Sequence, residues 1–414
     1  MTKEKGIPQI RFSGFTDTWE QRELRTAATF SKGSGYSKND LKENGTPIIL
    51  YGRLYTKYET VISEVDTFVD VQPNSVYSTG HEVIVPASGE TAEDISRASF
   101  VAKSGILLGG DLNIIVPDDY INPVFLALTI SNGNQQKELS KRAQGKSVVH
   151  IHNSDLENVV LLYPKYEEQE KIGEYFSKLD SLITLHQRKY DKLTKVKKAM
   201  LEKMFPENGS SYPEIRFKGF TDAWEQRKFS ELTEIRSASR VHKEEWQSSG
   251  VPFYRSSDVM AALNGTENEK AFISEELYEK LSAVSGKLEK GDVLVTGGGS
   301  VGKPYIVPNN EPLYTKDADL LWIKNNENLD PYFVYTFFFS PTFTDYLNSV
   351  SHVGTIAHYT ITQLGETPIT LPCVSEQQKI GDYFRNLDSL ITLHQRKLEK
   401  LKNIKKACLE KMFV

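Results

Sequence analysis

The chain contains an internal duplication that limits the folds open to it. Residues 8–24 (PQIRFSGFTDTWEQREL) recur as residues 213–229 with 12 of 17 positions identical, at an offset of 205. Residues 172–205 recur as residues 380–413 with 25 of 34 positions identical, at an offset of 208. Self-similarity at a nearly constant offset indicates one structural unit written twice. We therefore predict two halves of equal length with their elements in the same order.

The segments between the matched blocks diverge. Short runs still correspond, such as Glu82-Val-Ile-Val with Asp292-Val-Leu-Val, and Asn122-Pro-Val-Phe with Asp330-Pro-Tyr-Phe. Apolar strand-like runs alternate with short helical stretches, and glycine- and serine-rich turns separate them. We predict two globular α+β domains of one fold with different surfaces, the first head around residues 25–146 and the second head around residues 230–354.

The better-matched blocks predict two long helices. Their apolar positions alternate in steps of four and three, which is the heptad pattern of a coiled coil, and 34 residues form a rod of about 50 Å. We expect the two helices to pair antiparallel with pseudo-twofold symmetry, and packing of each helix on its own head is the alternative. The predicted interface, in which the two histidines have a structural role, consists of Ile172, Phe176, Leu179, Ile183, His186, Leu193, Ile380, Phe384, Leu387, Ile391, His394 and Leu401.

These blocks also predict the order of domains along the chain. We expect a first recognition domain at 1–160, which includes the segment 8–24, and a central spacer helix at 161–212. A second domain at 213–370 and a C-terminal spacer helix at 371–414 follow. The segment after the first long helix begins PEIRF, and we expect the N-terminal PQIRF segment to occupy the equivalent place beside the last helix.

Composition excludes several classes of protein. The chain has two cysteines, Cys373 and Cys408, so a disulfide framework or a cysteine-based zinc site is excluded. No apolar run is long enough to span a bilayer, and the N-terminus lacks a signal-peptide core, which favours a cytoplasmic protein. The net charge is −5, with 50 Lys and Arg against 55 Asp and Glu. Nucleic-acid binding would therefore require local clusters of cations.

Motifs of catalysis are missing from the sequence. The glycine-rich run at 297–303 nearly satisfies the phosphate-loop pattern, but Pro304 replaces the hydroxyl residue that would hold magnesium. The eight histidines show no metal-ligand spacing. We expect no catalytic residue, no metal and no cofactor in this chain, and we interpret 297–303 as a loop whose backbone can approach DNA.

Basic and aromatic residues interleave in both heads. Arg and Lys reach phosphates and guanine, whereas polar side chains and backbone amides position the duplex. The candidate DNA-binding residues are Lys32, Tyr36, Arg53, Lys57, Lys141, Arg142, Lys146, Arg236, Arg240, Lys243, Arg255, Ser300 and Lys303.

The whole chain resembles the specificity subunit of type I restriction–modification systems, and its N-terminal segments resemble those of Gram-positive members. The resemblance rests on the P-x-I-R-F-x-G-F-x-D-x-W-E-Q-R segments, on the P-x-x-x-E-Q-x-K-I-G entries at 164–173 and 372–381, and on the L-D-x-L-I-x-L-H-Q-R-K helices. The G-D-V-L-V-T strand and the glycine loop at 291–302 are also similar to that family.

The resemblance implies a non-catalytic DNA-recognition subunit. Each head would read one half of a split, asymmetric site in double-stranded DNA, and the helices would act as a ruler and as docking surfaces. Two modification subunits with S-adenosylmethionine would methylate adenine N6, and two restriction subunits would use ATP and Mg²⁺ for translocation and cleavage. Two alternatives from the residues stay open: a coiled-coil adaptor that binds proteins, and an unrecognised NTPase or nuclease.

Overall fold

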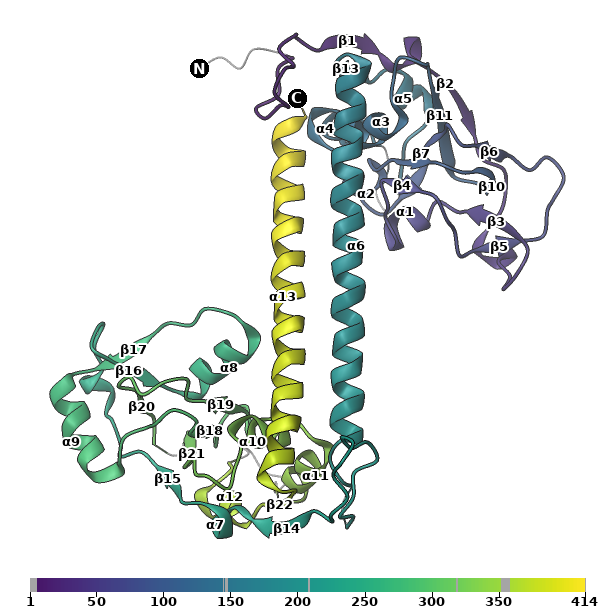
Figure 1. The fold of residues 1–414 in the computed structure, drawn as a ribbon. Coiled ribbons are helices and arrows are strands. Elements are labelled where there is room, and N and C mark those ends of the chain that lie inside the picture. Colours follow the sequence, from purple (N-terminus) through teal and green to yellow (C-terminus); the bar gives the residue numbers. More distant parts are fainter. Residues whose placement is uncertain are drawn as a thin grey trace. The chain divides into compact units, whose positions relative to one another are not determined.

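The computed structural model describes residues 6–143, 145, 148–207, 209–317, 319–350 and 358–413. Its internal contacts divide the chain into two compact units, 1–187 with 396–414, and 188–395. The long helices α6 (Tyr166–Lys203) and α13 (Val374–Met412) each contribute to both units. In each unit, one head packs beside two helical segments (Figure 1).

Both units contain a head of mixed helices and short strands, and the two heads share part of their element order. The elements of the first head are β1 (Glu20–Glu23), η1 (Leu24–Thr26), β2 (Ala28–Lys32), η2 (Lys38–Asp40), β3 (Thr46–Ile49), α1 (Arg53–Thr56), β4 (Val61–Ile62), β5 (Phe68–Val69), β6 (Tyr77–Thr79), β7 (Val83–Pro86), β8 (Ser88–Gly89), α2 (Ala92–Ile95), β9 (Ser99–Val101), β10 (Ser104–Leu108), β11 (Leu112–Pro117), α3 (Pro123–Ile130), α4 (Gly133–Arg142), β12 (Val149–His150), α5 (Asn153–Glu157) and β13 (Val160–Tyr163).

The elements of the second head are β14 (Glu225–Lys228), α7 (Phe229–Leu232), β15 (Ile235–Ser237), η3 (Lys243–Glu245), β16 (Val251–Tyr254), α8 (Ser256–Asn264), β17 (Ala271–Ile273), α9 (Glu275–Ser285), β18 (Val293–Thr296), β19 (Pro304–Ile306), β20 (Tyr314–Thr315), β21 (Leu320–Ile323), α10 (Pro331–Phe337), α11 (Pro341–Val350), α12 (Ile361–Glu366) and β22 (Pro368–Leu371). The α+β class predicted for both heads is confirmed, as are the strands predicted around Glu82-Val-Ile-Val and Asp292-Val-Leu-Val.

A central, mainly antiparallel sheet organises each head, and in the first head β4 pairs parallel with β9. The strand order is β2-β11-β7-β9-β4 in the first head and β15-β21-β18-β19 in the second. Successive side chains of a strand point to opposite faces of the sheet. Val83 and Val85 therefore join the core that contains the long helices, whereas Ile84 joins a separate core with a smaller sheet. In β18, Val293 and Val295 join the core that contains the long helices, and Leu294 joins a separate core.

The helices α3 and α10 start at equivalent caps. The side chain of Asn122 accepts hydrogen bonds from the amides of Val124 and Phe125, and Asp330 accepts one from the amide of Phe333. Proline follows each cap, where its fixed φ suits the first helical position. The short match noted between these sequences therefore marks one structural feature in two heads.

Buried glutamines attach each long helix to its head. Gln169 accepts a hydrogen bond from the Asn122 amide and donates to the carbonyl oxygens of Tyr120 and Pro164. Gln377 makes the equivalent contact with the amide of Asp330. These side chains are almost fully buried, so satisfied hydrogen bonds are needed at this junction.

A glycine on each long helix allows the helix backbone to lie close to the head at this junction. A Cβ atom at Gly381 would lie 2.3 Å from a carboxylate oxygen of Asp330, and one at Gly173 would lie 3.2 Å from Val124. The isoleucine–glycine pair at each helix entry therefore serves helix packing.

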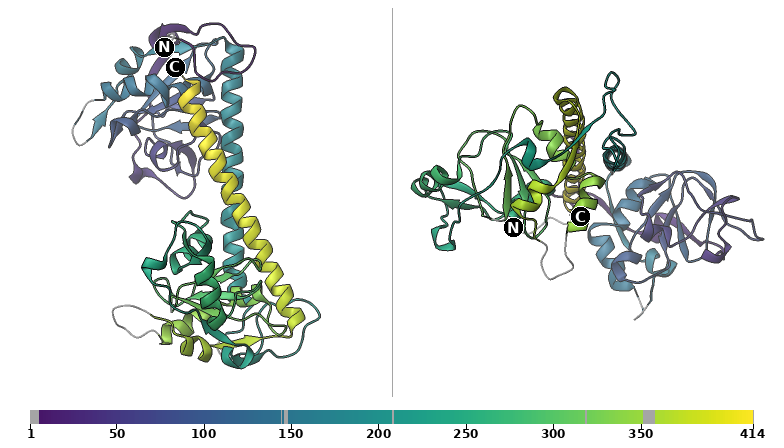
Figure 2. Two further views of the ribbon diagram at one scale, coloured as in Figure 1. Left: turned by 90° about the vertical axis from the view of Figure 1, so that its left-hand side faces the viewer. Right: turned by 90° about the horizontal axis from the view of Figure 1, so that it is seen from below.

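Within each unit the paired helical segments run antiparallel, side by side in the views of Figures 1 and 2. In the first unit, Lys405 of α13 donates to Asp180 of α6 at 2.5 Å. In the second unit, Lys197 of α6 donates to Asp388 of α13 at 2.5 Å. The two ion pairs are related by the offset of 208, so the units use one packing arrangement.

The predicted helix interface contributes to both cores. Ile172, Phe176 and Leu179 are buried in the first unit, with Leu401 packed against them. Ile380, Phe384 and Leu387 are buried in the second, with Leu193 packed against them. The remaining predicted positions, Ile183, His186, Ile391 and His394, are half-buried.

The N-terminal segment occupies the place that the repeat predicts for it. In the first unit, the Ile10 amide donates to the carbonyl oxygen of Lys411 at 3.0 Å. In the second, the Ile215 amide donates to the carbonyl oxygen of Lys203 at 2.8 Å. Because 10 and 411 correspond to 215 and 203 in the repeat, the end of each long helix receives one segment of this kind.

Two buried ion pairs clamp these segments, and we call them the segment clamps. Arg11 makes two hydrogen bonds with Glu168, at 2.6 and 2.7 Å. Arg216 makes two with Glu376, at 2.7 and 2.8 Å. The glutamate side chains are 1% and 0% exposed.

The contacts group the chain differently from the predicted domain order. Each compact unit joins a head to parts of both long helices, and the boundaries at 1–160, 161–212, 213–370 and 371–414 stay a prediction. In the described residues, no helix combines the length and apolar character that a membrane span requires.

Candidate nucleic-acid interface

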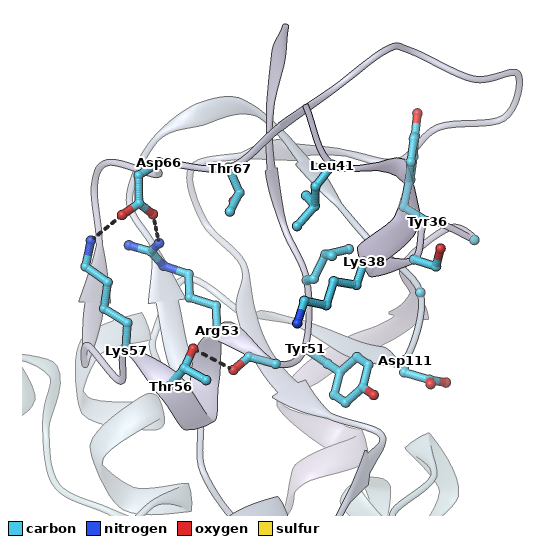
Figure 3. Close-up of a pocket in the computed structure, with 15 residues that line it drawn as sticks. Tyr36, Lys38, Leu41, Tyr51, Arg53, Thr56, Lys57, Asp66, Thr67 and Asp111 are labelled. Carbon is cyan, nitrogen blue, oxygen red and sulfur yellow. Dashed lines mark hydrogen bonds and ion pairs between the residues drawn. The ribbon is translucent and has the colours of Figure 1, made fainter. Parts of the chain in front are cut away.

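The first head contains a large open cleft of about 990 Å³. Its walls come from the turn around η2, the end of β3 and the helix α1, as Figure 3 shows. Lys38, Leu41 and Tyr51 line it, and Lys38 extends toward its centre. Ideal Cβ atoms at Gly35 and Gly52 would meet nothing within 4 Å, so backbone is open to a ligand there.

Three of the predicted DNA-binding residues meet at this cleft: Tyr36, Arg53 and Lys57. The Tyr36 ring is buried, and its hydroxyl accepts from the amide of Gln72. Lys57 donates to Asp66 at 2.8 Å. The structure therefore uses Tyr36 and Lys57 in internal contacts at the edge of the cleft.

Arg53 is a buried cation with carboxylate partners. Its guanidinium donates to Asp66 at 2.6 Å and to Glu59 at 2.7 Å, and it is 9% exposed. Hydrogen bonds from Lys57 and then from Arg53 lower the pKa of Asp66 to about 2. Arg53 thus stabilises the cleft wall by bridging two carboxylates, and these carboxylates neutralise its charge within the head.

We expect Arg53→Leu to lower the free energy of unfolding by about 2–3 kcal/mol, because charged hydrogen bonds are lost. The exposed Lys38→Met on the same cleft is the control, with an expected change within about 0.5 kcal/mol. The pKa of Asp66 is depressed in the folded state, so its contribution is present above about pH 4 and fades as the pH falls toward 2. Urea titrations at pH 7 and pH 3 measure both effects, and equal losses for the two variants would contradict this role of Arg53.

The second head has different side chains at the equivalent positions. The residue after η3 is Trp246 where the first head has Leu41, and the residue after β16 is Arg255 where the first head has Leu50. Arg255 lies over the Trp246 ring at 5.4 Å and donates to Asp258. The two heads therefore keep one backbone arrangement and present different surfaces.

The other predicted DNA-binding residues of the heads divide into paired and unpaired cations. Arg236 makes two hydrogen bonds with Glu234, both at 2.6 Å, and Arg142 donates to Glu138 at 2.5 Å. Exposed residues with no ion pair in the described part of the chain are Lys32, Lys141, Arg240 and Lys243. Lys146 lies outside the described residues.

The glycine-rich run lies in a β-hairpin. Strands β18 and β19 pair antiparallel on either side of it, with Val295 opposite Pro304. Ser300 is exposed at the tip, and the amide of Lys303 donates to the Thr296 hydroxyl at 2.8 Å. A phosphate loop requires a strand followed by a helix. The strand–turn–strand geometry therefore supports the interpretation of this run as a surface loop.

Sequence patterns missed several residues of the cleft. Lys38, Tyr51 and Asp111 line it but come from separate segments that only the fold brings together. Asp111 has a positive φ of 58°, which is uncommon outside glycine, so the turn before β11 is specially shaped. Among the described residues, no group of three or more metal-ligating side chains occurs.

Comparison with known proteins identifies the two heads and their helices. Residues 16–195 and 221–403 match the type I restriction modification DNA specificity domain. The chain is 22% identical over 348 residues to the type I restriction enzyme MjaVIII specificity subunit of Methanocaldococcus jannaschii, covering 82% of this chain and 80% of that protein. It is 24% identical over 432 aligned positions to the putative MjaX specificity subunit of the same organism, covering 98% and 95%.

A solved structure shares the fold. The type I restriction-modification system S subunit from M. genitalium aligns with a TM-score of 0.58 at 15% identity, covering 98% of this chain and 99% of that one. At this identity the likeness concerns the fold alone. From the two domain matches, which span most of its length, the chain belongs to the type I restriction modification DNA specificity domain family and contains that domain twice.

Proposed function

We propose that this chain is the DNA sequence-recognition subunit of a type I restriction–modification complex. The observation that carries the proposal is the two matches to a DNA specificity domain. The two matched heads have equivalent cores and different surfaces. Two different readers in one chain suit a bipartite, asymmetric site in double-stranded DNA, with one head for each half-site. Half-sites one DNA turn apart are separated by about 34 Å.

The chemistry of the complex belongs to partner subunits. Modification subunits would supply S-adenosylmethionine and the adenine pocket, and restriction subunits would supply ATP hydrolysis and Mg²⁺. The role of this chain is then recognition and assembly in the cytoplasm. The hairpin at 297–303 argues against an NTPase of the phosphate-loop type.

Exposed leucines support docking of two identical partners. Leu182 and Leu185 of α6 are 43% and 45% exposed, and Leu390 and Leu393 of α13 are both 44% exposed. These pairs are related by the offset of 208 and lie in the identical run LDSLITLHQRK. One apolar pair in each unit would accept one modification subunit, because burying a leucine contributes about 1.5–3 kcal/mol.

We expect Leu182→Lys with Leu185→Lys to weaken binding of one modification subunit by roughly 100-fold or more, because two apolar contacts are lost. Native mass spectrometry of the reconstituted complex should then show one modification subunit in place of two. Thr184→Lys with Thr392→Lys controls for added charge on the same helices. Retention of two modification subunits by the leucine variant would contradict docking at these residues.

The proposed function is tested by reconstitution. The full chain is combined with its modification subunits, and methylation is mapped on a DNA library of random sequence. The proposal expects adenine methylation confined to one bipartite motif and only in the presence of this chain. Methylation without this chain, or at sequences unrelated to any motif, would overturn it.

A further inference from the structure

A basic groove lies between the first head and the last turns of α13, inside the first unit. One hollow of about 530 Å³ is lined by Lys137 of α4 and by Lys402, Lys405 and Lys406 of α13. A second hollow of about 320 Å³ adds Arg97 and shares Lys405 with the first. Because residues such as Asn132 and Gln136 also line both, the two hollows form one continuous groove, which we call the helix–head groove.

The charge of this groove is largely uncompensated. Glu410 is the acidic residue that lines it. Lys405 donates to Asp180, and Arg97 lies 2.8 Å from Asp94. The exposed Lys137, Lys402 and Lys406 have no ion pair in the described part of the chain. Three free ammonium groups thus face one groove in a chain whose net charge is −5.

The N-terminus of α4 also lies at the groove. Asn132 stands at the N-cap of α4 without capping it, because its side chain donates to the carbonyl oxygen of Leu128. The first turn of α4 contains no acidic residue. The partial positive charge of the helix start therefore adds to that of the lysines.

The second unit repeats this charge only in part. At the offset of 208, Lys137 corresponds to Asp345 of α11, and Lys402 corresponds to Thr194 of α6. The helices themselves are equivalent, since α4 follows α3 as α11 follows α10. Lys405 and Lys406 keep lysine counterparts, Lys197 and Lys198. Lys137 and Lys402 have none, so the shared helix packing does not require these two cations.

We propose that the helix–head groove binds the sugar–phosphate backbone of DNA without reading its sequence, an inference that rests on the proposed function. Lysine side chains are flexible point charges that suit phosphates, and they carry no base-edge pattern of their own. Five cations line the groove, against three large apolar side chains, Tyr58, Leu128 and Leu409, so its chemistry favours a polyanion over an apolar peptide. The last part of the spacer helix then contributes directly to DNA affinity.

The test uses Lys402→Gln with Lys406→Gln in the full chain assembled with its modification subunits. Binding to a duplex that contains the target motif and to one that lacks it is measured by fluorescence anisotropy between 50 and 300 mM KCl, two limits chosen as roughly the range in which counterion release is measurable. Loss of two phosphate contacts should reduce the slope of log K against log salt by about 1.8, and affinity by on the order of tenfold for each contact at 0.1 M salt. Both duplexes should be affected equally, and the methylated motif should not change.

Two further variants separate the possible outcomes. Lys397→Gln with Lys411→Gln makes the same change of charge on exposed positions of α13 outside the groove, and the wild-type slope is expected. Lys402→Arg with Lys406→Arg keeps the charge and should restore binding. An unchanged slope would overturn the proposal, and an unchanged slope with weaker subunit assembly would assign the groove to an acidic protein partner. Absence of motif-dependent binding by the wild-type complex would instead reject the proposed function itself.

Discussion

Replacement of residues 25–146 by the corresponding segment of another family member is expected to change one half of the methylated motif completely. The other half-site and the spacing should persist, because the second head and both long helices are untouched. In each unit, one hydrophobic core joins the head to the long helices. The two heads differ on the surface that lies away from this core. Methylation mapping by single-molecule sequencing measures the outcome.

The donor segment must keep the residues that pack the head onto the long helices. These are a capping Asn or Asp at position 122 with proline after it, and a large apolar side chain at Phe125. The reciprocal exchange of residues 230–354 is the matched control and should change only the other half-site. A motif that is unchanged, or that changes in both halves after one exchange, would refute the assignment of one head to one half-site.

Loss of a segment clamp is expected to have the largest effect on stability. Arg11→Met leaves Glu168, which is 1% exposed, as an unpaired buried charge. Removal of one partner of a buried pair costs about 3–5 kcal/mol. We expect the first unit to unfold at lower urea than the second, so that a single transition separates into two.

A matched surface pair provides the control for the clamp. Lys165 lies 2.7 Å from Asp17, and both side chains are mostly exposed. Lys165→Met should cost at most about 1 kcal/mol, because water screens exposed pairs. The double variant with Arg11→Met and Glu168→Leu should recover part of the lost stability, since no buried charge remains. A loss for Arg11→Met no greater than that for Lys165→Met would contradict the clamp.

Sequence periodicity predicts the helices and the equivalence of the heads well. The heptad steps identify residues such as Phe176 and Phe384, because burial on one helix face repeats with a fixed period. The caps at Asn122 and Asp330 could also be recognised, because asparagine or aspartate before proline has a local meaning. The helices begin earlier than the matched blocks, at Tyr166 and Val374, since their first turns pack on the heads.

The role of the glutamates at the helix entries could not be predicted from local pattern. Acidic residues in a first helical turn suit the helix dipole wherever they occur. Glu168 and Glu376 instead form buried ion pairs with arginines 157 and 160 positions earlier in the chain. Such a contact depends on the tertiary fold, and only the repetition of both partners in the two halves hinted at it.

The candidate DNA-binding residues were the hardest to predict. A basic residue near an aromatic one has the same local pattern whether it faces DNA or a carboxylate of its own domain. Arg53, Arg236 and Arg255 form ion pairs with carboxylates of their own heads, and their contact with DNA stays a prediction. The helix–head groove could not be predicted from local pattern, because α4 and α13 are far apart in the sequence.

The most direct test of DNA recognition by this chain is the methylome of cells with and without its gene. A single bipartite, asymmetric motif is expected to carry N6-methyladenine in the parent and to lose it completely on deletion, with recovery on complementation. Restoration by a chain whose first head has been exchanged should yield a motif with one new half. A methylome that is the same in the presence and absence of the gene, while the modification subunits are expressed, would contradict DNA recognition by this chain.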